Sequence, residues 1–329
     1  MRYLVTGGAG FIGSHLTHAL LARGDSVHVL DNLSTGRLQN IQPFIAQPKF
    51  SYTIGDIRDP NIVDRLVREC DVVVHLAAAV GVKLIMENPV ETIITNVRGT
   101  EVVLEHASRH DKLTLVASTS EVYGKIMEHD ASVEALREDG DWRLGPTSKR
   151  RWAYACSKAM DEFLAMAYFD EKRLPVIVVR YFNTVGARQT GRYGMVIPSF
   201  VQRALLNDPI QVFGDGQQTR CFNHVADAVT ATLRLLDTPA AQGQVFNVGN
   251  TIELSIMELA QRIKDAAQST SEIVHVPYDE AYGAGYEDMR RRTPDLSKLR
   301  AAIGYEPRHT PDDIIRDVIE HYRHGEVAP

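Results

Sequence analysis

A glycine-rich turn near the start of the chain constrains the fold more than any other feature. The stretch VTGGAGFIGSH follows the apolar run RYLVT directly and opens a helical pattern. Glycines permit a tight turn and a close approach of the backbone, and the amides at a helix N-terminus can then bind a pyrophosphate. We therefore expect a dinucleotide-binding site formed by Gly7, Gly10, Phe11, Ile12 and Gly13.

The first half of the chain alternates short apolar runs with helical patterns. The runs are apolar on successive residues, which is typical of parallel strands buried on both faces. Strands are expected at 2–6, 26–31, 49–54, 71–77, 113–118 and 175–182. Helices are expected at about 11–23, 60–69, 89–109 and 152–172. This alternation predicts an α/β fold with a Rossmann-type, doubly wound parallel sheet.

The pattern changes after Asn183, where we expect a smaller α/β lobe that binds the substrate. It contains a helix interrupted by Pro198 within 193–208, further helices at 225–236, near 255–267 and near 311–323, and a buried strand in GQVFNVGN. We place the dinucleotide-binding domain at 1–182 and the substrate lobe mainly at 183–329, with segments of about 218–248 returning to the sheet. A ligand is expected beyond the carboxyl ends of the strands, between the lobes.

Composition excludes several classes of partner. The net charge of −6 gives no electrostatic reason to expect nucleic acid or an anionic membrane as a partner. The three cysteines, Cys70, Cys156 and Cys221, are far apart in sequence and predict reduced thiols, with neither a disulfide framework nor a metal site. No apolar run approaches the roughly 18 residues that span a bilayer, and the chain opens without a signal-peptide pattern. We expect a cytoplasmic protein.

An acidic residue at the end of the second expected strand favours one cofactor. Asp31 follows Gly13 by 18 residues. A carboxylate at this place can accept hydrogen bonds from both ribose hydroxyls and would repel a 2′-phosphate, which favours NAD over NADP. Arg37 lies nearby and is the residue that could instead bind a phosphate.

A tyrosine and a lysine form the second chemical signal. Tyr154 and Lys158, in WAYACSK, are four residues apart and share one face of an expected helix. A free phenol has a pKa near 10, and a nearby ammonium and a nicotinamide cation would lower that pKa, so that the tyrosine can act as a base. Thr119, just after the fifth expected strand, offers a hydroxyl that would position a substrate oxygen.

Taken together, these motifs resemble the extended short-chain dehydrogenases. The order of the glycine turn, Asp31, GDIRD at 55–59, HLAAA at 75–79, Asn96, Thr119 and the Tyr154–Lys158 pair is that of this family. In the second half, RYFNTVGARQ, VFGDGQQTRCFNHVADAV, VFNVGN and RRTPDLSK are similar to nucleotide-sugar epimerases and dehydratases. The resemblance covers essentially the whole chain and implies NAD as a tightly retained cofactor and a nucleotide sugar, UDP-linked, as substrate.

The resemblance also implies roles for individual residues. Tyr154 would be the base, Lys158 its partner and the ligand of the nicotinamide ribose, and Thr119 the hydroxyl of the triad. Further cofactor contacts would come from Asn32, Asp56, Ile57, Leu76, Ala77, Ala78 and Asn96. Contacts with the substrate would come from Ser120, Asn183, Arg188, Gln211, Val212, Phe213, Arg220 and Arg291 or Arg292.

The residue that divides the possible reactions is Glu121, two positions after Thr119. In the family NAD oxidises the sugar at C4, and a 4-epimerase then needs only room for the keto-sugar to rotate. UDP-glucuronate decarboxylases and GDP-mannose dehydratases resemble this chain in having a catalytic glutamate here, whereas dTDP-glucose dehydratases have Asp where this chain has Ser120. Arg188 and Arg192 could bind a sugar carboxylate or a phosphate. We expect a UDP-glucose-type UDP-sugar 4-epimerase, an isomerase; UDP-glucuronate decarboxylation is the alternative, followed by 4,6-dehydration.

The resemblance implies a homodimer in which the helices at 89–109 and 152–172 pair into a four-helix bundle. The apolar residues Phe163, Leu164 and Met166 fit this arrangement, and they would equally fit an ordinary core. A regulator that binds NAD without catalysis would not need Tyr154, Lys158 and Thr119 together, so an enzyme is favoured.

Overall fold

Seven strands within the described residues form one parallel sheet. The computed structural model describes residues 1–191, 195–282 and 287–325. The strand order is β11-β6-β5-β4-β1-β2-β3. Their bounds are β1 (Arg2–Thr6), β2 (Ser26–Asp31), β3 (Phe50–Ile54), β4 (Val72–His75), β5 (Leu113–Thr119), β6 (Val176–Tyr181) and β11 (Gln244–Val248). The expected α/β, Rossmann-type fold is confirmed.

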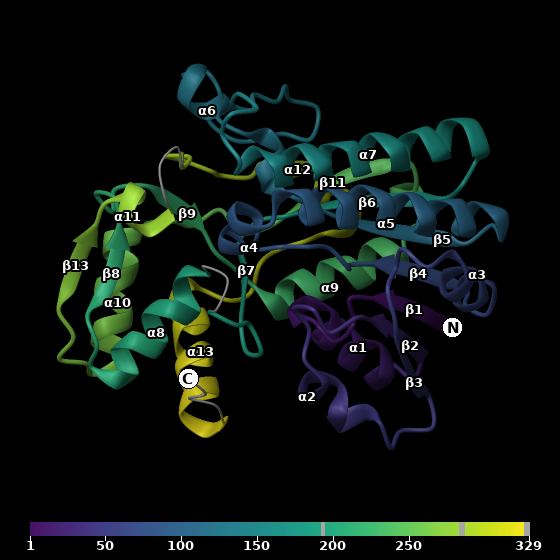
Figure 1. Cartoon of the computed structure of the whole chain (residues 1–329), viewed down its shortest axis with the longest axis horizontal. Coiled ribbons are helices and arrows are strands. Elements are labelled where there is room, and N and C mark those ends of the chain that lie inside the picture. Colours follow the sequence, from purple (N-terminus) through teal and green to yellow (C-terminus); the bar gives the residue numbers. More distant parts are fainter. Residues whose placement is uncertain (192–194, 283–286, 326–329) are drawn as a thin grey trace.

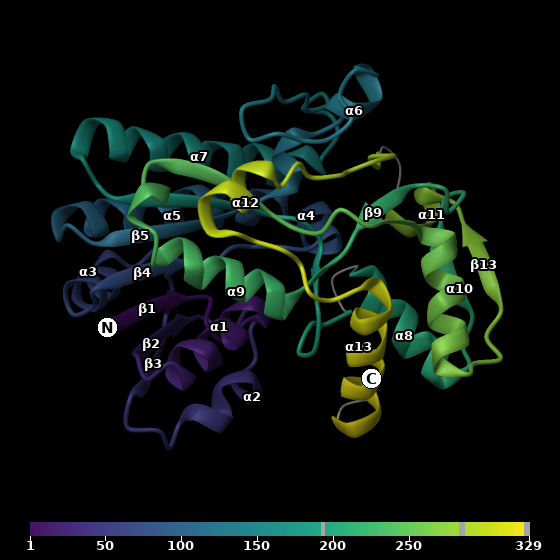
Figure 2. The ribbon, with the colours of Figure 1, turned by 180° about the vertical axis from the view of Figure 1, so that it is seen from behind.

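Helices cover both faces of this sheet, because successive side chains of each strand point to opposite faces. One face packs on α3 (Pro60–Arg68), α5 (Pro89–Arg109) and α7 (Trp152–Lys172). The other packs on α1 (Phe11–Ala22), α9 (Val225–Leu236) and α12 (Ser297–Ile303). Figures 1 and 2 show α5 and α7 side by side on one side of the sheet, with α1 and α9 on the other.

A second core lies beyond the carboxyl ends of the strands. It joins α8 (Val196–Leu206), α10 (Ile256–Ala267) and α13 (Pro311–Gly325) to β8 (Ile210–Phe213), which pairs with β13 (Ile273–Val276). Two further two-stranded sheets connect the lobes, β7 (Thr184–Val185) with β10 (Asn223–His224) and β9 (Thr219–Cys221) with β12 (Glu253–Ser255). Figure 1 shows β8, β13 and α10 well separated from the large sheet.

Short elements complete the described chain. They are α2 (Leu38–Ile41), α4 (Val82–Glu87), α6 (Ile126–His129), α11 (Tyr278–Tyr282) and the 3-10 turns η1 (Gln42–Phe44), η2 (Ser120–Tyr123) and η3 (Pro239–Ala241). Two helices have N-termini that the sequence encodes clearly. Asp59 accepts hydrogen bonds from the backbone N–H groups of Asn61 and Ile62 at the start of α3, and Ser255 accepts one from Glu258 at the start of α10.

Most expected elements lie where the pattern placed them, and α5 and α7 have the predicted bounds. Pro198 does not interrupt α8. It lies in the first turn of that helix, where its missing N–H would have had no intrahelical partner. β11 pairs with β6 and α9 packs on the sheet, so this part of the second half adds to the large sheet. The division of the chain into two domains at residue 182 stays a prediction.

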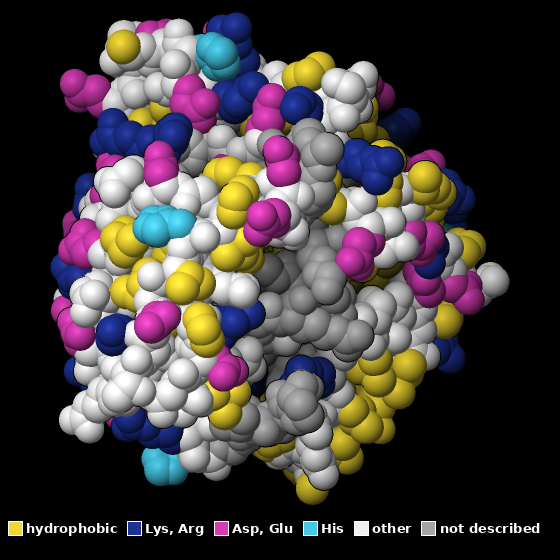
Figure 3. All heavy atoms as spheres, turned by 60° about the vertical axis from the view of Figure 1, so that its left-hand side comes forward, with side chains coloured by type: hydrophobic (Ala, Val, Ile, Leu, Met, Phe, Trp, Pro, Cys, Tyr) yellow, Lys and Arg dark blue, Asp and Glu magenta, His cyan; other side chains and the backbone are white. Residues whose placement is uncertain are grey.

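The surface carries charges of both signs, and the helices in the described part of the chain lack membrane-spanning character. On the face in Figure 3, acidic and basic side chains are interspersed among the described residues, and neither sign dominates a large area. None of the helices in the described ranges combines the length and the apolar character that crossing a membrane would need.

Candidate active site

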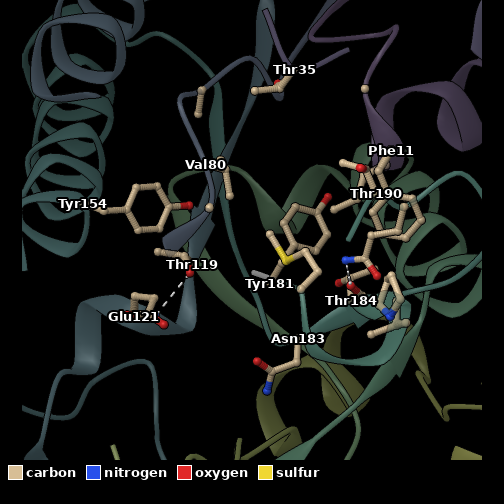
Figure 4. Close-up of a pocket in the computed structure, with 18 of the residues that line it drawn as sticks. Phe11, Thr35, Val80, Thr119, Glu121, Tyr154, Tyr181, Asn183, Thr184 and Thr190 are labelled. Carbon is tan, nitrogen blue, oxygen red and sulfur yellow. Dashed lines mark hydrogen bonds between the residues drawn. The ribbon is translucent and has the colours of Figure 1, made fainter. Parts of the chain in front are cut away.

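A cavity of about 510 Å³ lies at the carboxyl ends of the sheet strands, where the second lobe faces them. Its wall includes the glycine turn after β1, the ends of β2, β4, β5 and β6, the start of α7, and residues of α8, β8 and the segment before α12. In a doubly wound sheet the crevice beyond the strand ends is where ligands bind. Figure 4 shows Tyr154, Thr119 and Glu121 on one side of this cavity and Phe11 and Thr190 on the other.

The glycine turn is packed too closely for other residues. Gly7 has φ of +70°, and a Cβ there would lie 2.8 Å from the backbone N of Ala77. A Cβ on Gly13 would lie 2.2 Å from the carbonyl oxygen of Gly7. No side chain among the described residues caps the N-terminus of α1, whose N-cap is Gly10. The first amides of α1 therefore face the cavity uncapped, as a pyrophosphate site requires.

Asp31 lies at the cavity wall at the end of β2. Its carboxylate accepts hydrogen bonds from the backbone N–H groups of Ala9 (2.9 Å) and Leu33 (2.8 Å). Burial raises its pKa, and the backbone donors oppose that shift. The carboxylate is thus fixed in orientation next to the glycine turn, where the ribose of a dinucleotide is expected. These residues fit NAD.

Most, but not all, of the expected cofactor residues line the cavity. Those that do are Gly7, Gly10, Phe11, Ile12, Gly13, Asp31, Asn32, Ile57, Leu76, Ala77, Ala78, Tyr154 and Lys158. Asp56 does not, and its carboxylate forms an ion pair with Arg58 at 2.7 Å. Asn96 is buried behind the wall, where it accepts a hydrogen bond from the N–H of Ala79 and donates one to the Ser157 hydroxyl.

Tyr154 is buried near the start of α7 and contacts the end of β5. Thr119, the last residue of β5, lies on the same side of the cavity as the phenol of Tyr154 (Figure 4). Burial raises the pKa of Tyr154, the charge of Glu121 raises it further, and the nearby Thr119 hydroxyl acts in the opposite direction. Without a bound ligand, the phenol is therefore protonated at neutral pH.

Lys158 lines the same cavity, but its ammonium is paired with a carboxylate. Lys158 Nζ donates a hydrogen bond to Asp161 Oδ2 at 2.6 Å, and both side chains are buried. We expected this ammonium to favour the phenolate of Tyr154 and to hold the nicotinamide ribose. Instead, a buried partner one turn further along α7 offsets its charge.

Glu121 reaches the cavity through a 3-10 turn. Two positions apart, Glu121 and Thr119 would point the same way along a strand only if that strand persisted to residue 121. β5 ends at Thr119 and η2 begins at Ser120, with the Glu121 N–H donating to Thr119 Oγ1 at 3.2 Å. The tight turn still brings Glu121 to the cavity, beside Thr119.

Two arginines hold the Glu121 carboxylate. Arg151 Nη2 donates to Glu121 Oε2 at 2.6 Å, and Arg292 Nη1 donates to Glu121 Oε1 at 2.5 Å. Burial alone would raise the pKa of Glu121, but the two guanidinium groups outweigh it and lower that pKa. Glu121 is therefore a carboxylate at neutral pH.

The structure separates Arg291 from Arg292, the last two of the three arginines in MRRR (289–292). Arg292 is 7% exposed, lines the cavity, and also donates to Asn183 Oδ1 at 2.5 Å. Its buried Nε has no acceptor among the residues that the structure describes. Arg291 lies outside the cavity and forms an exposed ion pair with Glu253. Of Arg291 and Arg292, it is therefore Arg292 that can contact a ligand in the cavity.

Two residues of this cluster were missed in the sequence. Arg151 precedes α7, and Asp288 accepts hydrogen bonds from Arg151 at 3.3 Å and from Arg220 Nη2 at 2.8 Å. The three guanidinium groups of Arg151, Arg220 and Arg292 thus face two carboxylates, which leaves an excess of positive charge. Arg151 lies three residues before Tyr154, so the helix-face argument that found Lys158 could also have found it.

The remaining expected substrate residues are divided between the cavity and other places. Ser120, Asn183, Gln211, Phe213 and Arg220 line the cavity, whereas the side chain of Val212 packs in the core of the second lobe. Arg188 also lines the cavity, but its guanidinium lies 6.0 Å from the ring centre of Phe44, away from Tyr154. Arg192 lies outside the described residues. In the described parts of the chain, no group of His, Cys, Asp and Glu side chains could hold a metal ion.

Comparisons with known proteins agree with this geometry. The family model described as GDP-mannose 4,6 dehydratase matches residues 4–318. A UDP-N-acetyl-alpha-D-glucosaminuronate decarboxylase from Bacillus cytotoxicus is 41% identical over 98% of both chains. UDP-glucuronic acid decarboxylase 1 from Danio rerio is 36% identical over 93% of this chain and 69% of its own length. A UDP-glucuronic acid 4-epimerase from Bacillus cereus, solved with UDP-glucuronic acid and NAD, superimposes with a TM-score of 0.85 and 27% identity over 98% of this chain and 99% of its own.

These comparisons correct one expectation. We expected a UDP-sugar 4-epimerase, an isomerase. That expectation is wrong, because the curated relatives that match over nearly the whole chain are decarboxylases, which are lyases. The expected family and the expected cofactor, NAD, are confirmed.

Proposed function

The chain belongs to the GDP-mannose 4,6-dehydratase family of extended short-chain dehydrogenases, and we propose that it removes carbon dioxide from a UDP-linked uronic acid. The substrate is UDP-glucuronate or its 2-acetamido counterpart, and the product is the corresponding UDP-pentose. The observation that carries this proposal is the 41% identity, over 98% of both chains, to a decarboxylase of such a sugar. A cavity with an excess of arginine beside a buried tyrosine supports it.

NAD is the cofactor, and the residues that hold it are those of the glycine turn, Asp31 and the ends of β4 and α7. When bound, NAD supplies a hydride acceptor for C4 of the sugar and returns the hydride at the end of the reaction. The uncapped amides of α1 hold the pyrophosphate, and the Asp31 carboxylate accepts hydrogen bonds from ribose hydroxyls.

Tyr154 moves the proton at C4. Its phenolate oxygen takes the proton of the C4 hydroxyl during oxidation and gives it back during reduction, so Tyr154 ends the turnover unchanged. Thr119, which lines the cavity on the same side as the phenol (Figure 4), holds the C4 oxygen in line with it. Burial of Tyr154 excludes water from this transfer.

Arginine recognises the carboxylate that leaves. With a ketone at C4, the C5–C6 bond breaks, carbon dioxide departs, the electron pair is delocalised into the ketone, and C5 then takes up one proton. Arg292 has a buried Nε without an acceptor in the described chain, and Arg151 lies on the other side of Glu121. Guanidinium groups bind carboxylates in a fork-like geometry, so Arg292 binds the C6 carboxylate and Glu121 keeps both arginines in place.

The nucleotide is held by the second lobe. Arg220 and Asn183 face the cavity from β9 and from the turn after β6, and Arg220 is fixed by Asp288. Their positions suit the diphosphate. Gln211 and Phe213 line the wall at β8 and suit the uridine.

A second copy of the chain covers the outer face of α5 and α7. Ile93, Ile94, Met160 and Phe163 on these helices are exposed, and Phe163 is 66% exposed. Leu164 and Met166, by contrast, pack against the core between the sheet and the helices α3, α5 and α7. Four exposed apolar side chains on two adjacent helices fit a homodimer built on a four-helix bundle.

The test is an incubation of the purified protein with UDP-glucuronate and, separately, with UDP-N-acetylglucosaminuronate. We expect one of them to lose carbon dioxide and give a UDP-pentose, identified by product mass and by the proton spectrum of the sugar. Unchanged mass with inversion at C4 would refute the proposal. The substrate that reacts also decides whether the C2 substituent is a hydroxyl or an acetamido group.

A further inference from the structure

A buried carboxylate lies beside the ammonium of Lys158. Asp161 Oδ2 accepts the hydrogen bond of Lys158 Nζ at 2.6 Å, and the two side chains are 0% and 3% exposed. The residues are three positions apart on α7, so they share the face on which Tyr154 also lies. Because both groups are buried, solvent and salt do not screen this contact.

The elements packed around this pair add no further net positive charge. His75, at the end of β4, contacts the hydroxyls of Thr6 and Thr100. Burial, and then the charge of Lys158, lowers the pKa of His75 to about 3, so the ring is neutral at pH 7. The next acidic residue on α7, Glu162, is itself paired with Arg180 at 2.8 Å. Lys158 and Asp161 thus form a pair with no net charge.

The pair matters for the phenol of Tyr154. An ammonium near a phenol favours the phenolate, and a carboxylate favours the phenol. Asp161 is among the groups that raise the pKa of Tyr154, after burial and Glu121 from η2, whereas Arg292 from the second half of the chain lowers it. The other carboxylate oxygen of Asp161, Oδ1, is buried and has no hydrogen-bond partner among the described residues, so Lys158 is the contact that holds this carboxylate.

We propose that Asp161 is a positioning residue, which anchors the Lys158 ammonium and offsets its charge, and thereby sets the pH at which Tyr154 can accept the proton of the sugar hydroxyl. The proposal rests on the proposed function for the role of Tyr154 as base. Asp161 does not line the cavity, so it acts through Lys158 and does not touch the substrate.

The test replaces the carboxylate by an amide of the same shape, Asp161→Asn, in the NAD-bound protein. Lys158 keeps a hydrogen-bond acceptor but loses the opposing charge. We expect the phenol of Tyr154 to ionise at a pH lower by about one unit, the smaller end of the effect of a neighbouring charge. The readout is the pH titration of the tyrosine Cζ carbon by NMR with labelled tyrosine, and Tyr154→Phe identifies the signal. Equal titration in the variant and the wild type, or no titration in either, would overturn the proposal.

Two further variants control the experiment. Asp170→Asn removes the same charge from the exposed end of α7, about 13 Å further along the helix, and should leave the titration unchanged. The double variant Lys158→Met with Asp161→Asn removes both charges, and replacing a buried ion pair in this way is often tolerated even where a single change is not. It should titrate close to the wild type, whereas Lys158→Met alone should titrate higher. A double variant that titrates like Lys158→Met would contradict the claim that Asp161 offsets the charge of Lys158, and this comparison remains possible even if Asp161→Asn fails to fold.

A kinetic measurement separates this inference from the proposed function. The reduction of bound NAD on addition of UDP-glucuronate, followed by the absorbance of the reduced cofactor, should have its acid limb shifted to lower pH in Asp161→Asn. If no uronic acid sugar reduces the cofactor, the proposed function fails, but the NMR titration still tests Asp161. If the cofactor is reduced but the acid limb of the pH profile is the same in Asp161→Asn and the wild type, the inference about Asp161 fails and the proposed function stands.

Discussion

Changing Arg292 to methionine removes a guanidinium that links the two sides of the cavity. Arg292 joins Glu121 after β5 to Asn183 after β6 through two hydrogen bonds of 2.5 Å. Methionine fills a similar volume without charge. The Glu121 carboxylate keeps Arg151 but loses its second partner. We therefore expect a loss both of stability and of activity.

The size of the effect follows from the burial of the pair. Removing one partner of a buried ion pair costs about 3 to 5 kcal/mol, and the remaining contact of Glu121 with Arg151 places this change near about 3 kcal/mol. A loss of that size lowers the unfolding midpoint by roughly 6 to 12 °C for a chain of a few hundred residues. The loss of a buried charged donor to the substrate carboxylate costs at least about 2 kcal/mol, which is about 30-fold in kcat/KM.

Arg291→Met is the matched control, because Arg291 is adjacent in sequence and pairs with Glu253 at the exposed surface. An exposed ion pair contributes about 0 to 1 kcal/mol, so its midpoint should fall by no more than a few degrees and its kcat/KM should stay near that of the wild type. Thermal unfolding and initial rates of carbon dioxide release from UDP-uronate measure both quantities. Equal damage in the two variants, or full activity in Arg292→Met, would refute the reasoning.

Three further predictions follow from the same geometry. Tyr154→Phe should lower the rate of decarboxylation by at least about 100-fold while the protein still releases NAD on denaturation; a rate near that of the wild type would mean that another group is the base. Glu121→Gln should be less stable than the wild type above about pH 5, because a carboxyl group with a lowered pKa stabilises the fold only while it is ionised. The difference in unfolding midpoint should shrink as the pH falls below about 4.5, the pKa of the unfolded chain, and a difference that does not change between about pH 3 and 7 would contradict this. Phe163→Glu should convert the dimer into a monomer in light scattering, and an unchanged dimer would place the interface elsewhere.

The fold was largely predictable because its elements carry local signals. Continuous apolar runs marked the parallel strands, and the bounds of α5 and α7 followed from helical patterns. The places where the prediction failed depend on local geometry that the pattern does not contain. The 3-10 turn after β5, which brings Glu121 to the cavity, was not predicted, and Pro198 is harmless because it falls in the first turn of α8.

The site residues that lie within one short segment were predictable from the sequence, and those that distant segments bring together were not. The glycine turn and the Tyr154–Lys158 spacing are local, and both reach the cavity. Arg151, Asp288 and Arg292 come from distant segments, so only the folded chain shows that they surround Glu121 and which arginine of MRRR faces inward. The pairing of Lys158 with Asp161 is local, because the two residues are three positions apart on α7, and this spacing could have predicted it.

The reaction itself is tested most directly in heavy water. Removal of carbon dioxide by way of a 4-keto sugar leaves C5 to take one proton from the solvent, so a uronic acid sugar incubated with the protein in D2O should give a UDP-pentose with one deuterium at C5, seen in the proton spectrum and in the product mass. A product that retains its carboxylate, with or without inversion at C4, would contradict the account.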